Sequence, residues 1–541
     1  MTFDIVVRNG LVVDGTGNPW FRADIGLLDG RIARIGKIED SGIALSIDAG
    51  GRVVAPGFID MHTHSDLMVF SDPTLAAKVQ QGITTDVLAQ DGMSVAPINN
   101  GTRGPWRKIL AGLNGDPPVD WNWSALGEYM STLERLQLGI NVATLVPYGN
   151  IRTHVMGFGS SAATSADLEN MKSLVEQGMR EGACGMSLGL IYQPQMYATR
   201  AELSEVFSVV GRYHGVMVVH IRNEGDLLLE AIDEVLDICL SAGCALHISH
   251  IKVAGKANWH KGPLMLAKLE NARATGQDVT FDQYPYTAGS TFFHAILPPW
   301  ATEGGVNKII ARLHEPDLRR RMTSDIERMV GTNRPTQDPT LQYWDNFVGA
   351  AGWDGIMISH VGNQDLQAYE GRYVADMASQ NGQEPSDFAF DLLAASDCNV
   401  SMVVFFSSEE NVARFLAHDF GSIGSDGLLI GKCHPRAYGS FPRTLGRYVR
   451  EQGLTSLPQM IRRMTSFPAQ RLGLQDRGLI REGLKADVVI FDPSTIADVG
   501  TYEDPCRTPI GIKAVLVNGV LAVENGIITD ARGGQVLRRK N

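Results

Sequence analysis

The feature that most limits the fold is a unit that repeats between residues 56 and 474. Each unit has a short apolar strand, a turn and a helix-like stretch, the pattern of parallel strands joined by crossover helices. Eight such units predict an α/β fold, a (β/α)8 TIM barrel, whose chemistry gathers at the carboxyl ends of the strands. The predicted strands end near His62 to His64, Gln90 to Asp91, Pro147, Gly189, His220 to Arg222, His250 to Lys252, Tyr284 and Asp426.

Two other regions break this pattern. Residues 1–55 are short alternating segments separated by Asn-Gly and Asp-Gly turns, and a similar texture returns in residues 475–541. Because chain ends often lie close together, we expect these two regions to form one composite β-sandwich domain beside the barrel at 56–474. Roughly 130 residues separate the seventh and eighth strands, too many for one crossover. We therefore predict that residues 291–354 form an inserted lid subdomain.

Composition narrows the class of partner. The formal charge of -12 has no basic block, which argues against nucleic acid or an anionic membrane and favours a small-molecule substrate. No apolar stretch approaches a membrane span, and the N-terminus reads as a strand rather than a secretion signal. The six cysteines lack CxxC spacing, so we expect free thiols and a cytoplasmic protein. The sequence does not decide the oligomeric state, and a homo-oligomer is compatible with it.

Histidines and an aspartate follow four of the predicted strands. His62 and His64 share one side of an extended chain, His220 and His250 end two apolar runs, and Asp426 follows the last strand. Taken singly, each has a structural explanation, a satisfied core histidine or an Asx turn. Together they would converge above the barrel, where imidazoles suit zinc and a carboxylate lies beside the ion. The pattern predicts a hydrolase with one or two divalent metal ions, zinc first.

These motifs resemble a known family. The HTH segment after the first strand, the single histidines on strands five and six and the final aspartate are similar to the amidohydrolase superfamily. The segments GLIYQP, HIRNEG, SHIKVAG, YPYTAGST, LPPWATEGG and HPRAYGSFPR resemble its N-acyl-D-amino-acid deacylase (D-aminoacylase) branch, nearly from end to end. The resemblance implies a zinc-dependent barrel, a β-sandwich from both chain ends, a lid, and hydrolysis of N-acyl-D-amino acids to a carboxylate and a free D-amino acid.

The chain departs from that branch after the second strand. D-aminoacylases carry a cysteine there, where this chain has Asp91 in QDGMS, and the fourth strand has no lysine that could bridge two metals. Asp91 is therefore the expected anionic ligand, although an ordinary turn aspartate before glycine fits the same residues. The resemblance implies that His220, His250 and Asp91 hold the tight metal, and that His62 and His64 form a weaker second site.

The resemblance also assigns the reacting and substrate-binding groups. Asp426 would take a proton from the attacking water and pass it to the departing amine. Arg436 would bind the free carboxylate of the substrate in two places. A surface ion pair for Arg436, aromatic packing for Tyr284 and a turn cap for Ser290 are the ordinary alternatives. The residues predicted to bind the substrate are Arg436, Lys252, Tyr284, Ser290 and Tyr192.

Two other functions compete with this prediction. A cyclic amidase or N-carbamoyl amide hydrolase would use the same metal and aspartate but would not need a clamp for a free carboxylate. A non-catalytic assembly protein on the same scaffold has no need to keep every ligand. This chain retains all four histidines and Asp426, which argues against that alternative.

Overall fold

The computed structural model describes residues 2–39, 42–328, 341 and 343–540. Within them, parallel strands form the central barrel, and each pairs with its neighbours in chain order. The third barrel strand is interrupted at Leu145 and so consists of two pieces. The barrel strands are β6 (Phe58–Asp60), β7 (Ile83–Leu88), β8 (Asn141–Thr144) with β9 (Val146–Pro147), β10 (Gly185–Gly189), β11 (Val216–His220), β12 (Ala245–Ile248), β13 (Val279–Gln283) and β17 (Gly421–Ile423).

Backbone contacts close this sheet into a ring between β17 and β6. The Met61 N–H donates to the Ile423 carbonyl at 3.3 Å, and beyond the strands the Asp426 N–H donates to the His62 carbonyl at 2.7 Å. A parallel bridge joins Thr63 to Gly427 at the same seam. First and last strands are therefore neighbours, as the predicted TIM barrel requires, and the fold prediction is confirmed.

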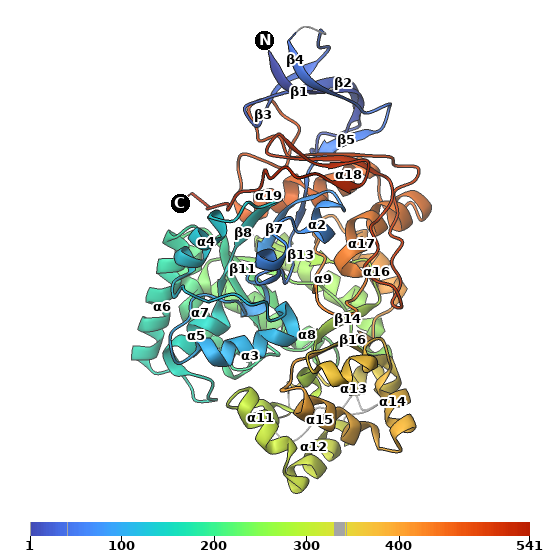
Figure 1. Ribbon diagram of the computed structural model, residues 1–541. Coiled ribbons are helices and arrows are strands. Elements are labelled where there is room, and N and C mark those ends of the chain that lie inside the picture. Colours follow the sequence, from blue (N-terminus) through green and yellow to red (C-terminus); the bar gives the residue numbers. More distant parts are fainter. Residues whose placement is uncertain (1, 40–41, 329–340, 342, 541) are drawn as a thin grey trace.

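Helices cover the outside of the ring, as α6 and α7 show in Figure 1. Their ends follow local rules: the Thr164 side chain accepts from the Asp167 N–H at the start of α6, and Thr199 does the same for Glu202 in α7. The helices of this layer and its loops are α1 (Met68–Ser71), α2 (Ala76–Val79), α3 (Arg103–Asn114), α4 (Leu126–Glu134), α5 (Tyr148–Met156), α6 (Ser165–Arg180), α7 (Arg200–Arg212), α8 (Leu228–Ala242), α9 (Gly262–Ala274), α16 (Glu409–Leu416), α17 (Arg436–Arg443), α18 (Leu457–Met464) and α19 (Ser466–Leu472).

Strands from both chain ends form one nine-stranded sheet at one end of the molecule (Figure 1). The join is the antiparallel pair β5 and β18, and buried side chains from both ends, such as Ile5, Val7, Val488 and Ile490, share one apolar cluster. The domain boundaries expected from the sequence stay predictions. The strands are β1 (Phe3–Val12), β2 (Phe21–Leu28), β3 (Arg31–Gly36), β4 (Ile43–Asp48), β5 (Val53–Pro56), β18 (Val488–Phe491), β19 (Ile512–Val517), β20 (Val520–Glu524) and β21 (Ile527–Ile528).

The segment between β13 and β17 adds a separate unit at the opposite end of the molecule (Figure 1). Its antiparallel sheet consists of β14 (Ala288–Phe292), β16 (Val400–Phe405) and β15 (Ile356–Val361), in that order. Part of the lid expected at 291–354, namely residues 329–340 and 342, lies outside the described residues. The helices of this unit are α10 (Pro299–Thr302), α11 (Val306–Leu313), α12 (Pro316–Arg328), α13 (Phe347–Ala351), α14 (Val374–Asn381) and α15 (Pro385–Ala395). In the described part of the chain, no helix has the length and apolarity needed to cross a membrane.

Candidate metal centre and substrate pocket

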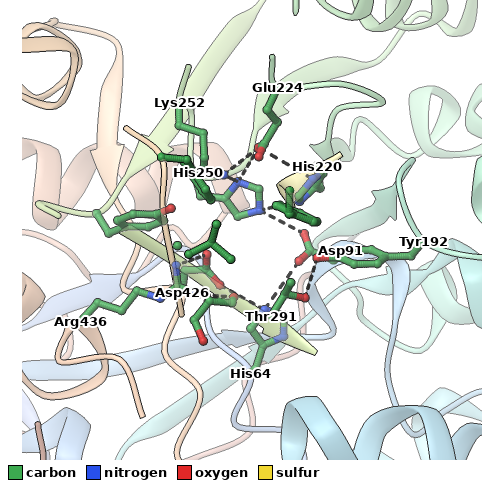
Figure 2. Close-up of a pocket in the computed structure, with 16 residues that line it drawn as sticks. His64, Asp91, Tyr192, His220, Glu224, His250, Lys252, Thr291, Asp426 and Arg436 are labelled. Carbon is green, nitrogen blue, oxygen red and sulfur yellow. Dashed lines mark hydrogen bonds and ion pairs between the residues drawn. The ribbon is translucent and has the colours of Figure 1, made fainter. Parts of the chain in front are cut away.

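The six residues predicted as metal ligands and proton shuttle meet in one place. Each follows the carboxyl end of a barrel strand, so closure of the ring brings them together. All are buried, and the side chains of all but His62 line a common cavity (Figure 2). They are His62 and His64 after β6, Asp91 after β7, His220 at the end of β11, His250 after β12 and Asp426 after β17.

The backbone is unusual at three of these residues. Asp91, His250 and Asp426 have φ of 54°, 33° and 49°, in the left-handed region that residues with a side chain rarely adopt. Tertiary contacts hold them there: the His250 N–H donates to Asp282 Oδ1 at 2.8 Å, and the Asp426 N–H is bound to the His62 carbonyl. Such conformations cluster at functional sites, where the surrounding structure compensates for the strain.

Asp91 lies at the centre of the histidines. Its carboxylate oxygens are 3.6 Å from the Nε2 atoms of His62, His64 and His250. Burial raises the pKa of Asp91, but His62 and His250 lower it well below its usual range, so the carboxyl is ionised. The distances exceed a hydrogen bond and leave room for an ion among the ligand atoms.

The polar atoms of this cluster fit a metal. Among the described residues, His62 Nδ1 and Nε2, Asp91 Oδ1 and His220 Nε2 are buried without a hydrogen-bond partner, an expensive arrangement unless a ligand satisfies them. The ligand atoms of His62, Asp91 and His250 all lie within 4.8 Å of one another. Burial also lowers the pKa of His220 to about 4, so its imidazole is neutral, the form that binds metal.

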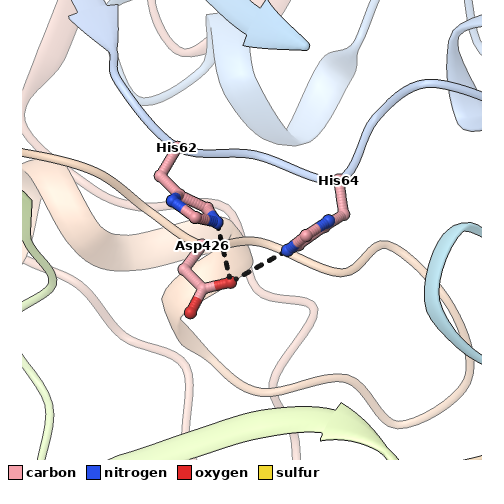
Figure 3. A group of neighbouring side chains, drawn as sticks. All are labelled: His62, His64 and Asp426. Carbon is pink, nitrogen blue, oxygen red and sulfur yellow. Dashed lines mark ion pairs between the residues drawn. The ribbon is translucent and has the colours of Figure 1, made fainter. Parts of the chain in front are cut away.

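Asp426 lies between the pair His62 and His64 on one side and the guanidinium of Arg436 on the other. Its Oδ1 lies 3.2 Å from His64 Nε2 and 3.8 Å from His62 Nε2 (Figure 3), and its Oδ2 lies 2.8 Å from Arg436 Nη1. Burial raises the pKa of Asp426, but Arg436 and His62 outweigh it and hold the pKa below its usual range. Asp426 is therefore an ionised carboxylate beside His62 and His64, able to accept a proton.

Glu224 joins the other side of the cluster. Its Oε1 lies 3.4 Å from His250 Nδ1 and 3.8 Å from His220 Nε2, close enough for a third metal-binding group of His220, Glu224 and His250. Lys252 Nζ is 2.7 Å from both Glu224 Oε1 and His250 Nδ1. Glu224 was not among the predicted site residues, and Arg222, two residues earlier, pairs with Glu234 at 2.8 Å. The four-residue spacing from His220 is the signal that could have identified Glu224.

The predicted substrate-binding residues line the same cavity. The Arg436 guanidinium lies 4.6 Å from the centre of the Tyr284 ring and donates to the Ser290 carbonyl at 2.9 Å. Tyr284 Oη and Ser290 Oγ have no hydrogen-bond partner among the described residues. Tyr192 Oη lies 3.0 Å from Thr291 Oγ1, a neighbour that the sequence did not indicate. Two cations and two free hydroxyls therefore line the cavity together with the predicted metal ligands, and the substrate-binding roles of these residues stay predictions.

A second cavity adjoins the first and shares Tyr192 and Phe347 with it. Most of its walls are apolar, and several come from the segment between β13 and β17. The sequence did not predict it, because its residues come from distant parts of the chain and share no motif. Its lining residues are Met93, Ile109, Ile191, Tyr192, Gln193, Met196, Phe292, His294, Ala295, Leu297, Thr302, Trp344, Asp345 and Phe347.

Comparison with known proteins places this site in a family. The sequence profile of the amidohydrolase family matches residues 46–523. The chain belongs to the amidohydrolase family. It is 35% identical over 537 residues to the N-acyl-D-glutamate deacylase of Alcaligenes xylosoxydans xylosoxydans, covering 99% of this chain and 96% of that one. It is 31% identical over 545 residues to the D-aminoacylase of the same organism, covering 99% of this chain and 98% of that one.

A solved structure agrees with these relatives. The N-acyl-D-glutamate deacylase of Bordetella bronchiseptica, complexed with zinc and a phosphonate inhibitor that mimics the tetrahedral intermediate, has a TM-score of 0.84 and 35% identity. The match covers 99% of this amidohydrolase and all of that chain (100%). The family and the branch predicted from the motifs are confirmed.

Proposed function

We propose that this amidohydrolase hydrolyses the amide bond of N-acyl-D-amino acids and releases a carboxylate and a free D-amino acid, with zinc as its cofactor. One observation carries the proposal: a single cavity is lined by four of the predicted metal ligands, His64, Asp91, His220 and His250, and also by the cations Arg436 and Lys252. A linear N-acyl amino acid needs both features, since its scissile amide lies one carbon atom from a free carboxylate. The relatives named for D-amino-acid substrates support the D configuration.

The metal would be held by His62, His64, Asp91, His220 and His250. All of these residues except His250 have a buried polar atom without a hydrogen-bond partner among the described residues. When bound, a divalent ion polarises the amide carbonyl and makes water nucleophilic at neutral pH. The sequence predicts one or two divalent ions, and their number stays open.

The protein's own groups would then handle protons and orientation. Asp426, ionised in the folded protein, accepts the proton of the attacking water and delivers it to the amine as it leaves. Arg436 offers a planar guanidinium to the substrate carboxylate, stacked on Tyr284 and held by the Ser290 carbonyl. The free hydroxyls of Tyr284 and Ser290 supply further donors.

The adjoining cavity favours an apolar group on the substrate. Its described lining contains neither lysine nor arginine. Burial lowers the pKa of His294 to about 4, so its imidazole is neutral at pH 7. Asp345, whose pKa burial raises to about 7, is neutral or negative, so neither side chain supplies a positive charge for an acidic substrate. We therefore propose that N-acetyl-D-methionine is a better substrate than N-acetyl-D-glutamate, unlike the substrate named for the N-acyl-D-glutamate deacylase.

The cyclic amidase alternative fits less well, because a ring amide leaves Arg436 and Lys252 without a carboxylate to bind. The assembly-protein alternative leaves the retained ligand set unexplained. Cytoplasmic location, the absence of a nucleic acid partner and a homo-oligomer stay predictions.

Two measurements on the purified protein test the proposal: metal content, and release of amine from N-acetyl-D-methionine and N-acetyl-L-methionine. We expect bound zinc and D-selective release that the Asp426→Asn variant loses. Hydrolysis of cyclic imides or N-carbamoyl compounds without release from either N-acetyl substrate would overturn the proposal and favour the cyclic amidase.

A further inference from the structure

Two cysteines that are 73 residues apart in the chain meet beside the substrate pocket. Cys433 Sγ lies 3.8 Å from Cys506 Sγ. Cys433 is buried in the loop that leads into α17, whereas Cys506 is exposed on the segment between β18 and β19. Nothing in the proposed hydrolysis uses either thiol.

The segment that carries Cys506 also supports the loop that carries Arg436. The Arg436 N–H donates to His434 Nδ1 at 3.0 Å, and the other ring nitrogen of His434 lies 3.0 Å from the Ala288 carbonyl. Tyr502 packs edge-on against His434, with ring centres 5.1 Å apart. Cys433 is next to this histidine in the chain, so a change at its sulfur is transmitted to the start of α17.

The two thiols differ in reactivity. A hydrogen bond from Cys433 lowers the pKa of Cys506 to about 7, and a further bond with Tyr438 acts in the same direction. The contact with Cys506, together with burial, raises the pKa of Cys433 well above its usual range. Cys506 is therefore the exposed thiol with thiolate character, and Cys433 is a protonated thiol within reach of it, the pairing of an attacking and a resolving cysteine.

We propose that Cys433 and Cys506 form a dithiol site that hydrogen peroxide converts to a reversible disulfide, and that this crosslink weakens substrate binding by displacing Arg436. The Cys506 thiolate attacks one peroxide oxygen, the O–O bond breaks, and the second oxygen leaves as water after taking a proton. Cys433 sulfur then attacks the sulfenic sulfur of Cys506, the S–O bond breaks, and the hydroxyl leaves as water with the thiol proton. Two thiols are oxidised by two electrons, one peroxide is reduced to two waters, and a dithiol reductant reverses the reaction.

Formation of the disulfide requires the chain to move next to Arg436, the residue proposed to bind the substrate carboxylate. The sulfur atoms must close from 3.8 Å to about 2.05 Å, the length of a disulfide bond. Arg436 lies three residues after Cys433 and starts α17, so the strain falls on the guanidinium that faces Asp426. Displacements of about 1 Å at a positioning group can cost up to about 100-fold in rate.

The test treats the full-length, metal-loaded, reduced protein with hydrogen peroxide, followed by peptide mass spectrometry and kinetics with N-acetyl-D-methionine. We expect a crosslinked peptide pair containing Cys433 and Cys506, lighter by two hydrogen atoms, and a KM about tenfold higher that dithiothreitol restores. Cys506→Ser should show neither effect. A second close pair joins Cys239 on α8 to Cys244 in the loop before β12, with sulfur atoms 3.5 Å apart. Cys244→Ser should leave both effects intact and serves as the matched control.

Absence of the Cys433–Cys506 peptide pair, or a crosslinked protein with unchanged KM, overturns the proposal. The kinetic part rests on the proposed function, but the crosslink does not. Failure to hydrolyse any N-acyl amino acid would therefore count against the function, while the mass spectrum would still decide whether the disulfide forms.

Discussion

Lys78 is the buried residue whose removal we expect to destabilise this amidohydrolase most clearly. It lies on α2 with none of its surface exposed, and its Nζ is 2.8 Å from Asp60 Oδ2 and 2.6 Å from Ser425 Oγ. Asp60 Oδ1 accepts from the Ser425 N–H at 2.7 Å and the His62 N–H at 3.3 Å. The ammonium therefore joins the first strand to the loop of the eighth, one residue before Asp426.

The substitution Lys78→Met keeps the length of the side chain and removes the charge. It leaves the Asp60 carboxylate, also fully buried, without the ammonium that lies against it. Breaking a buried pair on one side costs about 3–5 kcal/mol, a large share of a stability of about 5–15 kcal/mol. Adding Asp60→Asn removes the stranded charge, so the double variant should be more stable than Lys78→Met alone.

Urea unfolding of the metal-loaded protein measures both effects. The control is Lys268→Met, which breaks a pair of the same chemistry at the surface, 2.7 Å from Asp233, where about 0–1 kcal/mol is expected. If Lys78→Met lowered the free energy of unfolding by as little as Lys268→Met does, the reasoning would be refuted. The reasoning would also be refuted if the double variant lost as much free energy of unfolding as Lys78→Met and Asp60→Asn together, because Lys78 and Asp60 would then not interact.

Three other substitutions test the pocket and its surroundings. Arg436→Lys removes the two-point clamp, so KM for N-acetyl-D-methionine should rise by a factor of about 10–100, from charge-assisted bonds of about 1.5–3 kcal/mol; an unchanged KM contradicts the clamp. Asp91→Cys supplies a softer ligand and should raise the ratio of bound zinc to manganese, measured by elemental analysis; an equal ratio contradicts a ligand role. Burial raises the pKa of Asp86 from 3.8 to about 7, although Lys78 opposes the shift. Its protonated form therefore favours folding, and stability is lost as pH rises from about 4 to 7. Asp86→Asn should lose less stability between pH 5 and pH 8 in urea unfolding, and an unchanged pH dependence contradicts the prediction.

The strand ends that carry the predicted metal ligands could be located because they depend on local pattern. β11 ends at His220 and β12 ends two residues before His250, as the apolar runs indicated. Parallel strands in a barrel place their carboxyl ends on one face, so residues at these ends must lie near one another. Eight consecutive strand–helix units in one chain also predict that the strands pair in chain order and that the eighth strand meets the first to close the barrel.

The partners of these residues could not be predicted in the same way. Arg436 was predicted to bind the substrate carboxylate, and nothing in the sequence indicated that its guanidinium also lies 2.8 Å from Asp426. Glu224 pairs with His250 and Lys252, whereas Arg222, two residues earlier, pairs with Glu234. Each contact depends on the direction in which a side chain leaves its loop, and periodicity along the chain carries no such information.

The sequence by itself therefore determined the strands, their order, and the set of histidines and carboxylates at their ends, because alternation and spacing are properties of neighbouring residues. Only the tertiary structure decided which atoms meet: the Lys78 link between Asp60 and Ser425, the apolar cavity beside Tyr192, and the approach of Cys433 to Cys506. The physical reason is that these contacts join residues far apart in the chain, and their distances are set by barrel closure and by the packing of both chain ends against it.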